Sequence, residues 1–132
     1  MIFVDSNIPM YLVGGEHPNK SRAGLIIERE IASGQVLVTD AEVFQEILHR
    51  YVSIDRREAI DPAFQVLLDL IDDVFAVDMS DVIRASQIAQ RVKRISARDA
   101  IHVATMERHA VRSILSFDSD FDDWPSLHRI FQ

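Results

Sequence analysis

Three acidic residues stand at the ends of predicted strands. Asp5 follows "IFV", Asp118 follows "SILSF" and Asp78 follows "VFAV". Ligand sites of open α/β sheets are built at strand tips, so each acid is a candidate. Asp5 and the two polar residues after it could instead be a plain turn into a helix, because Asp, Ser and Asn are favoured N-caps and Pro9 suits a first helical turn. Asp78 is interpreted in that second way, since "MSD" after it is an ordinary helix start.

Further acids lie near the starts of two predicted helices. Glu42 comes three residues after Thr39, and Asp99 comes three residues after Ser96. This spacing is that of a capping box, in which the acid reaches back to the amide of the cap residue. Glu46 lies one turn beyond Glu42, within the largely apolar run "VFQEIL". Its carboxylate therefore lies at the edge of a solvated face or points at a partner.

Carboxylates gathered from strand tips and helix starts suit a divalent cation. Magnesium takes hard oxygen ligands, keeps several waters and is commonly held by a few carboxylates. One or two such ions activate water and stabilise a pentavalent phosphate, which is the chemistry of two-metal nucleases. The acids thus predict a magnesium or manganese site that hydrolyses phosphodiester bonds.

The elements that must position these acids alternate between short apolar runs and helical patterns. The runs predict strands at residues 2–4, 35–39, 74–78, 113–118 and 127–131. Apolar spacing and caps predict helices at residues 9–13, 21–32, 40–52, 61–71, 80–94 and 96–109, with Asp61 as the N-cap of the fourth. Short buried strands separated by helices indicate a three-layer α/β/α sandwich with a central, mainly parallel sheet of about five strands.

Length and composition restrict the class of protein. A chain of 132 residues with 48% hydrophobic residues predicts one globular domain, residues 1–132. No apolar run is long enough to span a membrane, no signal peptide is evident, and the absence of cysteine favours the cytoplasm. The net charge of −7 argues against nucleic acid as a ligand only if the acids hold no cations and the bases are dispersed.

Three stretches in this order resemble a known family over most of the chain. They are "IFVDSN", "TDAEVFQEIL" and "SARDAIHVATMERHAVRSILSFDSDFD", followed by a short terminal strand. The ordered set resembles PIN domains, in particular the small VapC-type endoribonuclease toxins. That resemblance implies a metal site of three or four acids, cleavage of single-stranded or loop RNA, a homodimer and a small antitoxin protein that blocks the site.

The resemblance transfers roles to individual positions. Catalytic and metal-binding roles fall on Asp5, Glu46, Asp99 and Asp118. Asn7 and Ser116 match polar positions beside the first and last acids and are expected to contact substrate. Phe117 stands where many members carry Asn, and the neighbouring Asp120 and Asp122 leave open which acid is the fourth ligand.

Histidines and bases near these acids have two interpretations each. His49 and His102, each three residues after a candidate acid, are expected to be structural or outside the metal's ligand shell, because magnesium has little use for imidazole. Four bases lie within residues 91–98. Arg94 and Arg98 among them are expected to contact the RNA backbone, and a solvated helix end is the other interpretation.

Two other functions stay open on the sequence alone. The protein could be a catalytically idle PIN scaffold that binds RNA or protein, although such a module has no need of four acids. It could also be a metal-dependent phosphohydrolase of small molecules. "FVDSN" is similar to the start of haloacid-dehalogenase phosphatases, but Asn7 stands where their general acid–base would fall.

Overall fold

Five parallel strands form the central sheet of the computed structural model, which describes residues 1–132. The order across the sheet is β3-β2-β1-β4-β5, with every neighbouring pair parallel. The strands are β1 (Ile2–Val4), β2 (Leu37–Asp40), β3 (Asp73–Phe75), β4 (Ser113–Leu115) and β5 (His128–Ile130). The prediction of a mainly parallel sheet of about five strands is confirmed.

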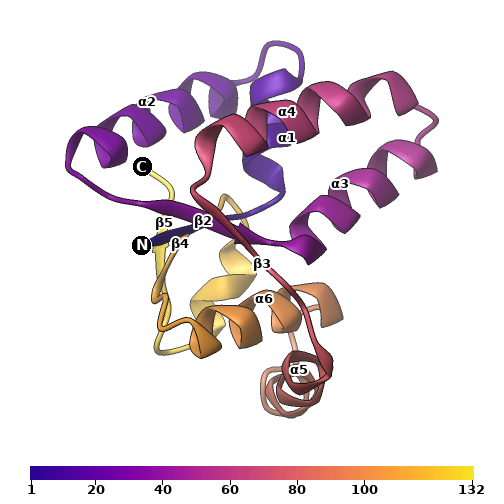
Figure 1. Cartoon of the computed structure of the whole chain (residues 1–132), viewed down its shortest axis with the longest axis vertical. Helices are drawn as coiled ribbons and strands as arrows, with labels where there is room; N and C mark the ends of the chain where they lie inside the picture. Colours follow the sequence, from indigo (N-terminus) through magenta and orange to yellow (C-terminus); the bar gives the residue numbers. More distant parts are fainter.

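Helices cover both faces of this sheet (Figure 1). Helices α1, α2 and α4 lie on one side, and α6, with α5 packed outside it, lies on the other. Helix α3 contacts both α4 and α6. The helices are α1 (Asn7–Val13), α2 (Pro18–Ala32), α3 (Ala41–Ser53), α4 (Ile60–Leu70), α5 (Met79–Arg91) and α6 (Ala97–Arg108), with 3-10 turns η1 (Arg57–Ala59) and η2 (Ser119–Asp123). The three-layer α/β/α sandwich is therefore confirmed.

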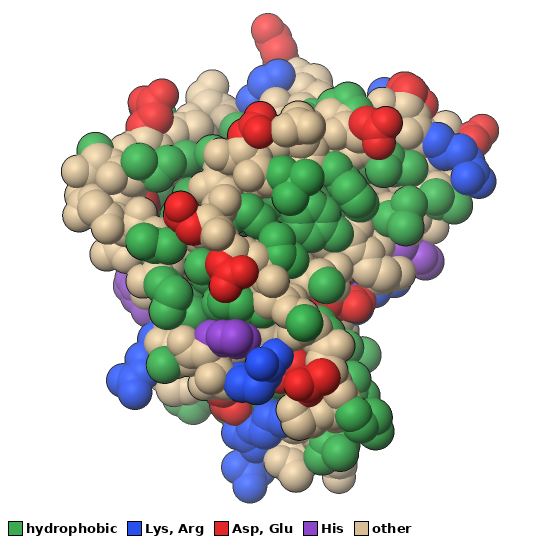
Figure 2. Space-filling model, viewed as in Figure 1, with side chains coloured by type: hydrophobic (Ala, Val, Ile, Leu, Met, Phe, Trp, Pro, Cys, Tyr) green, Lys and Arg blue, Asp and Glu red, His purple; other side chains and the backbone are tan.

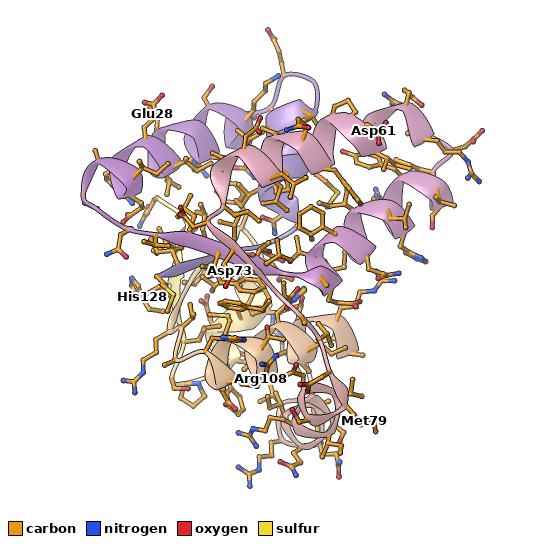
Figure 3. The ribbon with its side chains drawn as sticks, in the orientation of Figure 1. Glu28, Asp61, Asp73, Met79, Arg108 and His128 are labelled. Atoms are coloured by element: carbon orange, nitrogen blue, oxygen red, sulfur yellow. The ribbon has the colours of Figure 1, made fainter.

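Burial follows position in the sheet. All three residues of β1, the central strand, are buried, and so are all four of β2. Strand β3 lies at an edge, where Asp73 and Val74 are exposed; Figure 3 labels Asp73 there.

On the outer surface, hydrophobic side chains gather over the upper helices in Figure 2, whereas Lys and Arg gather at the lower end, around α5 and α6. No helix combines the length and the apolar character that crossing a membrane requires.

Several predicted boundaries were wrong by a few residues. The third strand ends at Phe75, and Asp78 is instead the N-cap of α5 in a capping box with Asp81, as its capping interpretation required. Helix α5 ends at Arg91, so Arg94 lies in a loop rather than on a helix. Helix α4 begins at Ile60, directly after η1, so Asp61 lies in its first turn and is not its N-cap.

The cap of α3 also differs from the prediction. Asp40, not Thr39, is its N-cap, and the Asp40 side chain accepts a hydrogen bond from Val43 N at 2.9 Å. The Thr39 hydroxyl donates to the carbonyl of Val4 in the neighbouring strand instead. Because β1, β2 and β4 are parallel neighbours, the residues that follow them meet at one edge of the sheet, where the chain reverses its strand order.

Candidate metal centre

Asp5 lies at this edge, directly after the central strand, and is only 3% exposed. Its Oδ1 accepts a hydrogen bond from Ser6 N at 2.8 Å. Its Oδ2 accepts from Ser116 Oγ at 2.6 Å and from Asn7 Nδ2 at 3.1 Å. Three donors therefore fix the orientation of one buried carboxylate, which is more than a turn between strand and helix requires.

Glu46 reaches the same place from α3. Its Oε2 accepts a hydrogen bond from Ser6 Oγ at 2.6 Å, and its Oε1 lies 2.7 Å from Nε2 of His102. One ligand atom from each of Asp5, Glu46 and His102 lies within 4.8 Å of the other two. The structure thus places Glu46 beside Asp5, as the helix-borne acid of the group.

Asp99 and Asp118 complete the predicted set. Asp99 lies in the first turn of α6, whose N-cap Ser96 accepts a hydrogen bond from Asp99 N at 3.1 Å. The Asp99 carboxylate, in contrast, accepts no hydrogen bond from any residue, and it does not close the predicted capping box. Asp118 caps η2, with its Oδ1 accepting from Asp120 N at 2.9 Å. A surface pocket is lined by Glu46, Ser96, Ala97, Arg98, Asp99, Asp118 and Asp120.

Burial and mutual repulsion raise the pKa values of two of the acids. Burial raises the pKa of Asp5 to about 6, against hydrogen bonds that lower it. Burial, together with the charges of Asp5, Glu46 and Asp118, raises the pKa of Asp99 to about 7. No Lys or Arg forms an ion pair with Asp5, Asp99 or Asp118. The charge of His102 lowers the pKa values of Asp5 and Asp99 but does not cancel the rise, so the negative charge gathered here is offset only in part.

The pKa values of Glu46 and His102 are shifted so that the charged form of each is favoured. Burial alone would raise the pKa of Glu46, but the hydrogen bond and charge of His102, the hydrogen bond of Ser6 and the charge of Arg98 outweigh it and hold the pKa below its ordinary value. Burial alone would lower the pKa of His102, but Asp40 and Glu46, one at each ring nitrogen, hold that pKa well above its ordinary value. The ionised form of Glu46 is therefore favoured.

The four residues expected to contact substrate fall into two kinds. Asn7 and Ser116 bond to Asp5, and Ser116 has no exposed surface with which to meet a substrate. Arg98 lines the pocket, 40% of its side chain is exposed, and its nearest acid is Glu42 at 4.0 Å. Arg94 pairs with Asp120 at 3.0 Å and with Asp123 at 3.5 Å.

Sequence reasoning missed one residue of this neighbourhood and undervalued another. Asp40 and His102 are both completely buried, and Asp40 Oδ2 lies 2.8 Å from His102 Nδ1. The position of Asp40 after a strand was the available signal, since Asp5 and Asp118 were selected on that basis. His49, the other histidine considered, is exposed on α3.

The donor set fits a hard divalent cation. Free oxygens remain on Asp99 and on Asp118, and the pocket opens onto these two acids and Glu46. Carboxylate oxygens are the ligands that Mg²⁺ and Mn²⁺ prefer. The lone imidazole close to the acids, that of His102, already has both ring nitrogens in contact with carboxylates.

Comparisons with known proteins add independent evidence on the family of this chain. The family model of the PIN domain matches residues 2–126. The VapC ribonuclease Mb1869c of Mycobacterium bovis is 49% identical over 130 residues, which cover 98% of this chain and 99% of that protein.

Two solved structures share the fold. The crystal structure of Mycobacterium tuberculosis VapC20, described as a sarcin-ricin loop cleaving toxin, has a TM-score of 0.75 at 22% identity and covers 92% of this chain and 93% of its own. A toxin-antitoxin complex from Klebsiella pneumoniae has a TM-score of 0.69 at 17% identity. The similarity covers 96% of this chain and 95% of that chain. At these identities both similarities concern the fold alone.

Proposed function

The chain belongs to the PIN domain family, and from that membership we propose that it is a metal-dependent endoribonuclease, the toxin of a toxin–antitoxin pair. The ribonuclease named in Mycobacterium bovis, nearly half identical over almost the full length, supports the reaction class. Its substrate is single-stranded or loop RNA, and residues 1–132 act as one catalytic domain in the cytoplasm.

One observation carries this proposal. The carboxylates of Asp5, Glu46, Asp99 and Asp118 gather at one edge of the sheet, and the pKa values of Asp5 and Asp99 are raised because burial and repulsion outweigh the opposing charge of His102. Such convergence is unfavourable unless a ligand compensates it. A Mg²⁺ or Mn²⁺ ion held by these four acids provides that compensation.

The protein's own residues prepare the site for the reaction. When bound, the metal supplies charge stabilisation to the phosphate and a more acidic water. Asp5 is oriented by Ser6, Asn7 and Ser116, and Glu46 by Ser6 and His102. Asp99, with no protein donor, contributes an oxygen free to bind. Ser116, which has no exposed surface, thus acts on substrate only through Asp5, whereas Asn7 is half-buried.

RNA approaches through the pocket that opens onto Glu46, Asp99 and Asp118. Arg98 lines it and has only the long contact to Glu42 to give up for a phosphate, whereas Arg94 must first give up Asp120 or Asp123. The partners proposed with this activity are a small antitoxin protein, as in the complex from Klebsiella pneumoniae, and a second copy of the chain in a homodimer.

The experiment compares two glutamates one turn apart on α3. Cleavage of a structured RNA is measured with Mg²⁺ or Mn²⁺, and with excess chelator, for the wild type, Glu46→Gln and the control Glu42→Gln. Glu46→Gln should abolish cleavage, while Glu42→Gln, which does not line the pocket, should retain most of it. Robust cleavage in chelator would refute the metal mechanism, and RNA binding without cleavage under any condition would indicate an idle scaffold.

A further inference from the structure

Glu46 is held by a buried hydrogen-bond chain, and we propose that His102, anchored by Asp40, is a positioning residue that fixes the Glu46 carboxylate for metal binding. This inference rests on the proposed function and adds to it residues that the four-acid site does not include. The chain runs from the end of β2 through α6 to α3, and its members are 56 and 62 residues apart in sequence.

The anchor of the chain is Asp40. Its Oδ1 accepts from Val43 N at 2.9 Å, and its Oδ2 accepts from Thr105 Oγ1 at 2.9 Å and lies 2.8 Å from His102 Nδ1. The side chain is completely buried. Asp40 is therefore bound to its own helix start and to α6 at once, which leaves it one orientation.

His102 transmits that orientation to the site. Its side chain is completely buried, its ring packs 5.3 Å from the ring of Phe3 in the central strand, and its Nε2 lies 2.7 Å from Glu46 Oε1. Ser6 Oγ donates to the other oxygen of Glu46 at 2.6 Å. Both oxygens of Glu46 are thus directed before any metal binds, and the side chain loses little conformational freedom on binding.

His102 suits this role better than a place among the ligands. Its ring nitrogens, the only two metal-binding atoms of imidazole, both lie at hydrogen-bond distance from carboxylate oxygens. Residues that orient metal ligands in this way typically contribute about 10- to 100-fold to metal affinity. A purely structural buried network would leave metal affinity unchanged.

Two substitutions of His102 separate the two ring nitrogens. The amide nitrogen of Gln can occupy roughly the position of Nε2 and donate to Glu46, whereas that of Asn falls near Nδ1 and can serve only Asp40. Mn²⁺ affinity is measured by titration calorimetry. His102→Asn should weaken it at least ~10-fold, and His102→Gln should remain closer to the wild type.

The matched control is His109, seven residues along the chain. Its ring stacks on Phe75 at 3.7 Å and touches none of the four acids. His109→Asn should leave Mn²⁺ affinity unchanged. Equal affinity of His102→Asn and the wild type, or equal losses in the Asn and Gln variants of His102, would overturn the inference.

A further variant guards against misfolding. If either His102 variant does not melt cooperatively, Ser6→Ala provides the test at the other oxygen of Glu46, where a weaker Mn²⁺ affinity is expected and an unchanged one overturns the inference. If the wild type binds Mn²⁺ and cleaves RNA while the variants keep the wild-type Mn²⁺ affinity, the positioning role is refuted and the proposed function stands. A wild type that binds no Mn²⁺ refutes the proposed function, and the positioning role with it.

Discussion

Asp81 and Asp99 occupy the same position in their helices but differ in whether other residues bond to their carboxylates. Each is the third residue after the N-cap of its helix, in α5 and α6, which pack against each other. Each is largely buried, with 2% and 9% exposure. Asp81 accepts hydrogen bonds from Asp78 N at 3.0 Å and from Arg108 at 2.8 Å on each oxygen, whereas the Asp99 carboxylate accepts none.

The difference separates a structural acid from a site acid. Arg108, labelled in Figure 3 on α6, supplies the cation that makes the burial of Asp81 tolerable. No Lys or Arg pairs with Asp99, and burial and neighbouring acids raise its pKa to about 7 although the charge of His102 opposes the rise. A buried acid without a Lys or Arg partner or a hydrogen bond of its own thus points to a ligand site more strongly than one that the fold has already paired.

The largest effect expected is on catalysis at Asp99. Asp99→Asn preserves shape but removes a charged ligand, so it should lower the RNA cleavage rate on the order of 1,000-fold, as the loss of a preorganised electrostatic group does. Gel assays of cleavage in Mn²⁺ measure it. Asp81→Asn, tested alongside at a temperature where it stays folded, should cleave at close to the wild-type rate.

The converse effect is on stability at Asp81. Asp81→Ala opens the capping box of α5 and removes the partner of the partly exposed Arg108, so the free energy of unfolding should fall by about 1 kcal/mol. Urea denaturation measures it, in chelator. The stabilisation that Mn²⁺ adds should be unchanged in this variant; a smaller one would mean that Asp81 belongs to the metal site.

Stability of the metal-free protein should depend on pH through the site acids. The pKa values of Asp5 and Asp99 are about 6 and about 7 in the folded protein, above the ordinary 3.8, so the folded state binds protons more tightly than the unfolded one. Stability from these groups is complete at acid pH and is lost as pH rises through the folded-state values. The raised pKa of His102 acts in the same direction.

In chelator, the melting temperature should therefore fall by on the order of 5 °C between pH 5 and pH 8. Asp99→Asn should make that decline shallower, because one of the titrating groups is gone. A melting temperature that rises over this interval would contradict this account. So would a decline in Asp99→Asn as steep as that of the wild type, because repulsion among the site acids would then not control the pH dependence.

The smallest effect separates the closely paired Arg94 from Arg98, whose one ion-pair contact, to Glu42, is 4.0 Å long. Arg98 lines the site pocket, whereas Arg94 pairs with Asp120 and Asp123. Arg98→Gln should lower the salt dependence of RNA binding by roughly 0.7 log units per lost phosphate contact, and Arg94→Gln should lower it less. Binding isotherms at several salt concentrations measure both. Unchanged slopes in the two variants would indicate a solvated helix end and loop.

The fold was largely predictable because its signals are local. Buried strands such as Ile2–Val4 are short apolar runs, and helix starts such as Ser96 carry a cap within a few residues. The resemblance selected Asp5, Glu46, Asp99 and Asp118, which the structure gathers at one edge of the sheet. Their roles as ligands stay a prediction.

What the sequence did not predict depends on distant contacts. The pairing of Asp40 with His102 joins residues 62 apart, and no periodicity reports it. The choice between Thr39 and Asp40 as the cap of α3 depended on whether Thr39 would bond across to β1, which it does. Likewise, only the position of Arg108 distinguishes Asp81 from Asp99.

The most direct test of a metal at this edge is a set of thermal melts of the wild type and Asp99→Asn in chelator and in Mn²⁺. Asp99→Asn suits this better than Asp5→Asn, because three donors bond to Asp5 and an amide would face one of them. In chelator at neutral pH, Asp99→Asn should melt higher than the wild type, since it relieves repulsion. Added Mn²⁺ should raise the melting temperature of the wild type strongly and that of the variant little. The reason is that a ligand stabilises the native state more when it binds more tightly. A variant that melts lower in chelator and gains as much from Mn²⁺ as the wild type would contradict a metal site built on Asp99.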